Sequence, residues 1–66
     1  MGKTTIEFFR GHRRQWVAAI YHNSVCVSWQ TVGTMRNVRR IIKKQLEPIG
    51  ASYRIYSGYI ITDLKE

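Results

Sequence analysis

One segment of this chain, residues 34–47, carries the apolar spacing of a helix, whereas the segments around it have strand character. Its apolar residues recur three or four positions apart and form one stripe: Met35, Val38, Ile41, Ile42 and Leu46. Thr34 is typical of a helix N-cap, and the helix ends at Glu47-Pro48 because the residue before proline avoids helical dihedral angles. A single amphipathic helix has to bury its stripe against a sheet, which predicts one two-layer α+β domain over the 66 residues (1–66).

Three segments before the helix have the composition of β-strands: residues 4–10, 15–22 and 25–30. Turns are predicted at 10–14, where Gly11 can adopt positive φ, and at 22–24, where Asn23 tolerates the left-handed region. The third segment alternates, with one set of side chains on each face, and this predicts a half-buried antiparallel strand. The first set is Val25, Val27 and Trp29, and the second is Cys26, Ser28 and Gln30.

The segment 51–62 fits two structures. It is either one long edge strand with a bulge at Gly58, or a hairpin that turns at Ser57-Gly58. We favour the single bent strand. The predicted fold is then α+β: a three-stranded antiparallel meander, one amphipathic helix packed on one face, and a final edge strand (βββαβ two-layer sandwich). A right-handed crossover would place the last strand parallel to the first, in the spatial order 3-2-1-4.

The charge pattern is the strongest functional signal. The net charge is +7, and no acidic residue lies between Glu7 and Glu47. Five cations of this span fall on the helix, in an arc of about 140° opposite the apolar stripe. Arg36 lies in the first turn, where the helix dipole disfavours a cation, so the cations serve something other than helix stability. The predicted binding residues are Arg10, Arg13, Arg14, Arg36, Arg39, Arg40, Lys43, Lys44 and Arg54.

Such a surface attracts polyanions or acidic protein surfaces. Phosphate contacts would give affinity that depends on salt and little on sequence. Tyr56 and Tyr59 are candidates for stacking on bases, together with Tyr21 and Tyr53. Trp29 could stack in the same way, but we expect it to fill the core between helix and sheet.

The sequence gives no sign of an enzyme. His12, His22 and Cys26 are the only soft metal ligands, and they lack the paired spacing of a zinc site. No cofactor, metal or small-molecule substrate is predicted, and the GKT at 2–4 lacks the preceding glycine and strand of a phosphate-binding loop. We expect no membrane span and no signal peptide. The single cysteine suits a reducing cytoplasm, that of the host cell if the protein is phage-encoded.

Two resemblances cover about half the chain. Trp16, Thr34, the helical apolar positions and Gln45, Pro48 and Gly50 resemble the small early-phage ββαβ proteins that inhibit host RNA polymerase, although the helix of those inhibitors is acidic. RG (10–11), WVAAI (16–20) and GT (33–34) resemble the three-strand-plus-helix DNA-binding domains of plant ethylene-response factors and phage integrase arms, in which the sheet lies in the major groove.

Two functions are therefore expected. The first is a small basic nucleic-acid-binding protein of phage or mobile-element type, which contacts phosphates of DNA or RNA through its basic helix face. The second is a phage-encoded inhibitor that binds an acidic or nucleic-acid-binding surface of a host protein, such as RNA polymerase or a defence (CRISPR) complex. It would use its basic patch or its edge strand. The chain would be a monomer or an edge-strand dimer.

Overall fold

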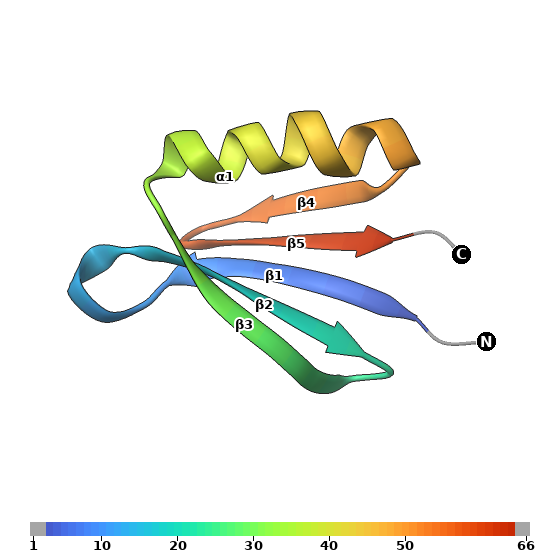
Figure 1. Ribbon diagram of the computed structural model, residues 1–66, viewed down its shortest axis with the longest axis horizontal. Helices are drawn as coiled ribbons and strands as arrows, with labels where there is room; N and C mark the ends of the chain where they lie inside the picture. Colours follow the sequence, from blue (N-terminus) through green and yellow to red (C-terminus); the bar gives the residue numbers. More distant parts are fainter. Residues whose placement is uncertain (1–2, 65–66) are drawn as a thin grey trace.

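The computed structural model describes residues 3–64 and shows a small α+β domain with a helix lying across one face of a sheet (Figure 1). Within these residues, five strands form one antiparallel sheet in the order β3-β2-β1-β5-β4. The predicted α+β class is confirmed. The elements are β1 (Thr4–Arg10), β2 (Trp16–His22), β3 (Val25–Gly33), α1 (Met35–Ile41), β4 (Ser52–Tyr56) and β5 (Tyr59–Leu64).

The helix begins where the sequence predicts, but the predicted end at Glu47-Pro48 is wrong, because Glu47 keeps helical dihedral angles (φ −59°, ψ −42°) and the proline lies in the first turn of a further helical segment. The Thr34 hydroxyl accepts a hydrogen bond from the backbone N–H of Asn37 at 3.4 Å, which confirms the N-cap. After α1 the helix continues as a π-helical segment (Ile42–Leu46) and a 3₁₀ turn (Glu47–Ile49). Gly50 then ends it in the left-handed conformation, with φ +81°.

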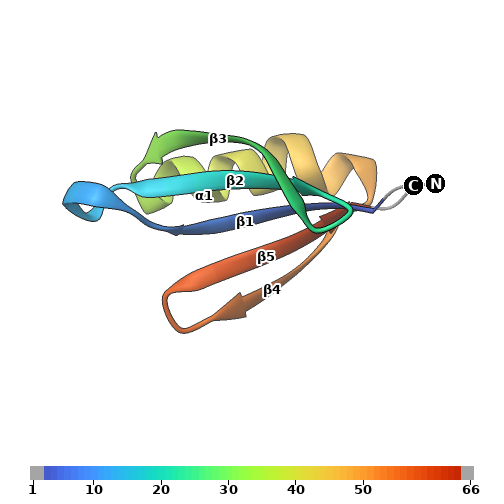
Figure 2. The ribbon, with the colours of Figure 1, turned by 90° about the horizontal axis from the view of Figure 1, so that it is seen from below.

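The predicted apolar stripe forms the core with the sheet. Val38, Ile42 and Leu46 are buried, and Met35 and Ile41 pack partly buried against the same cluster. The sheet contributes side chains from three of its strands: Phe8 from β1, Trp16 and Ala18 from β2, and Ile60 from β5. The core therefore lies between α1 and one face of the sheet, and α1 leaves the other face uncovered (Figures 1 and 2).

The prediction of one bent strand over 51–62 is wrong. Ser57 and Gly58 form a turn between β4 and β5, with Gly58 at φ +91°, so the segment is a hairpin. Because the hairpin reverses the chain once more, β5 is antiparallel to β1, and the predicted parallel pairing and 3-2-1-4 order are also wrong. Thr4 lies opposite Leu64 at one end of the β1–β5 pair, and Phe9 lies opposite Tyr59 at the other.

The prediction that β3 is half-buried is also wrong. Every residue from Val25 to Thr31 is exposed, and Trp29, expected in the core, is 66% exposed. A bulge explains the broken alternation: Ser28 pairs with Ile20 and Cys26 pairs with Tyr21, so Val27 is one extra residue. The bulge brings Cys26 and Trp29 to the same face, which is the one that α1 leaves uncovered.

Candidate functional site

The five cations of the helix lie on its outer side, which points away from the sheet. All are exposed, and they alternate with the buried stripe: Arg36, Arg39, Arg40, Lys43 and Lys44. The salt bridges found within residues 3–64 both involve Asp63, with Lys3 at 3.9 Å and Arg54 at 3.3 Å. The helix cations therefore have no acidic partner among the described residues. The helical stretch 35–46 extends over about 18 Å, at a rise of about 1.5 Å per residue.

A second group of cations lies at the end of the sheet where the helix begins. Arg10, Trp16 and Gly33 lie opposite one another on β1, β2 and β3, and Gly33 immediately precedes the N-cap. The Arg10 guanidinium lies over the Trp16 ring, 5.8 Å from its centroid. Arg13 and Arg14 follow in the loop that joins β1 to β2 (Figure 1).

The backbone of this loop differs from the prediction. Gly11 has a φ of −103°, and the left-handed residues are Arg13 at φ +58° and Arg14 at φ +60°. Gly11 is still required, because a Cβ there would lie 2.7 Å from the Val17 Cγ2 atom. Left-handed backbone costs L-residues roughly 1–2 kcal/mol each, so the loop holds its two arginines in a strained conformation.

Arg54 lies apart from the other predicted cations. It is on the face of the sheet that α1 does not cover, opposite Ile61, and it donates a hydrogen bond to the Asp63 carboxylate at 3.3 Å. The sheet separates it from the helix cations, and its charge is already paired. The loop cations thus lie at the end of the sheet where the helix begins, whereas Arg54 lies outside both the helix group and the loop group.

The uncovered side of the sheet, called here the open sheet face, carries several aromatic side chains. Tyr56 and Tyr59 stack with ring centroids 4.8 Å apart and an interplanar angle of 13°. Phe9 lies opposite Tyr59 on the next strand, so three aromatic residues follow one another across β4, β5 and β1. Phe9 and Trp29 were not predicted as site residues. Two features of the sequence could have indicated these exposed aromatic residues. Phe9 alternates with core-facing Phe8, and the sequence predicts no second helix that could cover this face.

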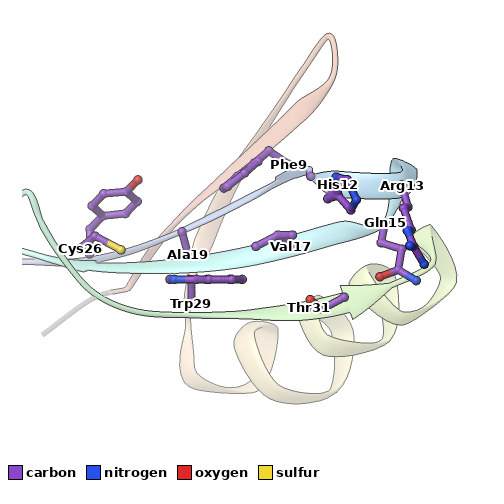
Figure 3. Close-up of a pocket in the computed structure, with 11 residues that line it drawn as sticks. Phe9, His12, Arg13, Gln15, Val17, Ala19, Cys26, Trp29 and Thr31 are labelled. Atoms are coloured by element: carbon purple, nitrogen blue, oxygen red, sulfur yellow. The ribbon is translucent and has the colours of Figure 1, made fainter.

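A hollow of about 530 Å³ opens on this face between β1 and β3 (Figure 3). Val17 and Ala19 of β2 form its floor, and Phe9 and Trp29 lie on either side of them. One end is lined by the loop residues His12 and Arg13 with Gln15, and the other by Cys26 (Figure 3). Tyr21, which also lines the hollow, is the partner of Cys26 on β2. Within residues 3–64, no three His, Cys, Asp or Glu side chains gather as a metal site would require.

Comparison with known proteins does not identify the chain: no protein-family model matches it, and no curated protein or solved structure shows significant similarity. None of the helices in the described part of the chain is long and apolar enough to cross a membrane.

Proposed function

We propose that the protein binds nucleic acid, and that the outer side of the helix contacts the phosphate backbone. The observation that carries this proposal is the set of five exposed helix cations with no acidic partner among residues 3–64. Lysine and arginine side chains on such a face neutralise phosphates and release condensed counterions, which gives most of the affinity of nonspecific binding.

Two further observations favour this function over a helix that merely keeps a small domain soluble. A solubilising helix normally carries Glu–Lys pairs four residues apart, which add a few tenths of a kcal/mol, and this helix has none between Arg36 and Lys44. The strained arginines of the β1–β2 loop lie at the same end of the sheet as the helix start. Both features lower stability and concentrate positive charge.

A salt titration tests the proposal. Fluorescence anisotropy with random duplex and single-stranded oligonucleotides should show log affinity falling linearly with log salt, by about 0.9 per phosphate contact on duplex. We expect Arg39→Ala to weaken all sequences alike and to reduce the slope by about one. On duplex, Arg54→Ala is the matched control, since it removes an arginine already paired with Asp63 on the opposite face of the sheet. Affinity weaker than about 100 μM for every oligonucleotide at low salt would exclude this function.

A second function remains supported by the edge of the sheet. Among residues 3–64, β3 pairs only with β2. It spans nine residues and contains no charged side chain, so its free edge can accept a strand from another protein. This geometry fits the phage-type inhibitor of a host enzyme or defence complex in a reducing cytoplasm. A pull-down from host lysate, with and without nuclease, separates the two functions, because a protein partner that survives nuclease favours the inhibitor.

A further inference from the structure

We infer that the open sheet face binds unstacked bases of a single-stranded nucleic acid, in addition to the phosphate contacts of the helix. The inference rests on the proposed function and adds the class of nucleic acid that this surface can take. Four observations support it: the row of aromatic rings, the width of the hollow, the charges around it and the position of the loop arginines.

The aromatic rings form a row that crosses neighbouring strands. Tyr56, Tyr59 and Phe9 lie opposite one another on β4, β5 and β1. The two tyrosine rings already stack on each other at 4.8 Å, which is also about the spacing of adjacent strands. Exposed aromatic rings on a sheet stack on bases of a single strand without selecting their sequence, because every base has a flat π-face.

The hollow has the width that a flat ring requires. Phe9 on β1 pairs with Val17 and Trp29 on β3 pairs with Ala19, so the two lie diagonally, about 9.6 Å apart across the strands and about 6.8 Å (two residues) apart along them. Between them lie only the small side chains Val17 and Ala19, and Figure 3 shows the two rings on opposite sides of Ala19. A base inserted between two aromatic rings needs about 7 Å, the sum of two van der Waals contacts of about 3.5 Å. The hollow therefore accommodates one base between the two rings.

The charges select a nucleic acid rather than a second copy of this chain. Arg13 and His12 line one end of the hollow, where a phosphate attached to the inserted base can lie. The acids on this face are Glu7 and Asp63, and Asp63 is paired with Lys3 and Arg54. Bases are uncharged, so Glu7 beside the row does not repel them. Two copies with a charge of +7 each would repel one another.

The loop also connects the open sheet face with the helix. The loop arginines follow β1 at the end of the sheet where the helix begins. At this end Arg10, Trp16 and Gly33 are paired across β1, β2 and β3, and Gly33 immediately precedes the helix N-cap. A strand that leaves the hollow at this end meets the loop cations and then Arg36 in the first helical turn. A duplex can contact the helix and loop cations through its phosphates, but its bases are paired and stacked and cannot enter the hollow.

The test compares three ligands of equal length: a thymidine oligonucleotide, an abasic strand with the same phosphates, and a duplex. We expect the protein to bind the thymidine strand about tenfold or more tighter than the abasic strand, and only the former should quench the fluorescence of Trp29. Trp29→Ala should lower affinity for the thymidine strand about 5- to 100-fold, toward that of the abasic strand. Tyr56→Leu should lower it in the same direction.

Val25→Ala is the matched control, because Val25 is an exposed apolar residue of β3 on the other side of the sheet, opposite His22. It should keep the preference for bases. Equal affinity for the thymidine and abasic strands would overturn the inference and leave the helix proposal intact. If the protein binds none of the three ligands, both the inference and the helix proposal are overturned. A wild-type dimer in light scattering that Trp29→Ala converts to a monomer would also overturn the inference, since a second copy would then cover the face.

Discussion

Arg13 and Arg14 are the residues whose backbone conformation the sequence does not indicate. Gly11 offered an obvious position for positive φ in the β1–β2 loop, yet the two arginines adopt it. Arg13, whose side chain lines the end of the hollow, and its neighbour Arg14 thus occupy the least favourable backbone positions of the loop. A conformation that costs stability at a binding surface is typical of residues whose role is contact with a ligand.

Replacing both arginines by glycine should separate stability from binding. Arg13→Gly with Arg14→Gly relieves the left-handed strain, so the free energy of unfolding should rise by about 1 kcal/mol after the greater entropy of the unfolded chain is included. Nucleic-acid affinity should fall, and the salt slope should become shallower. The control is Arg13→Lys with Arg14→Lys, which keeps both charges and the strain. Urea denaturation measures the first effect, and a loss of stability in the glycine variant would contradict the role given to the strain.

The helix was predictable from the sequence, whereas two strands were not. The spacing of Val38, Ile42 and Leu46 fits only a period of 3.6 residues, and Thr34 marks the start of the helix, although Pro48 does not end it. By contrast, Gly58 fits both a bulge and a turn, and only the antiparallel pairing of β4 with β5 shows that it forms the turn of a hairpin. The bulge at Val27 depends on pairing with β2, which no local pattern of β3 reveals.

The basic side of the helix faces outward only if the apolar stripe on its opposite side faces the sheet. A substitution that tests the burial of the stripe therefore also tests the orientation of the basic side. Ile42 is 5% exposed, and Ile42→Asp should cost several kcal/mol because it buries an unpaired charge. Ile49→Asp is the matched control at a residue that is 61% exposed, and its effect should stay within about 0.5 kcal/mol. Thermal denaturation followed by circular dichroism compares them. Equal melting temperatures for wild type and Ile42→Asp would show that the stripe does not face the sheet.

For the whole molecule, the excess positive charge should make folding and binding respond to salt in opposite directions. Screening weakens repulsion among the cations, since the Debye length falls from about 30 Å at 0.01 M to about 10 Å at 0.1 M. The melting temperature of the free protein should therefore rise between these concentrations while affinity falls. Lys43→Glu with Lys44→Glu lowers the net charge from +7 by two for each substitution, to +3, and should show a smaller rise. A melting temperature that falls with salt would mean that ion pairs outweigh repulsion.

The antiparallel pairing of β1 with β5 also determines how the domain responds to force. Thr5 and Asp63 are 58 positions apart in the chain, yet their side chains are hydrogen-bonded at 3.3 Å, and Thr4 lies opposite Leu64 beside them. Tension applied between Thr4 and Leu64 acts across the strands, so it loads the hydrogen bonds of this pair one after another, from Thr4–Leu64 toward Phe9–Tyr59. The sheet then separates between β1 and β5, the two strands that meet in the middle of its order. This leaves a β3-β2-β1 part and a β5-β4 part, and the hairpins within each part are not strained until the two parts have separated.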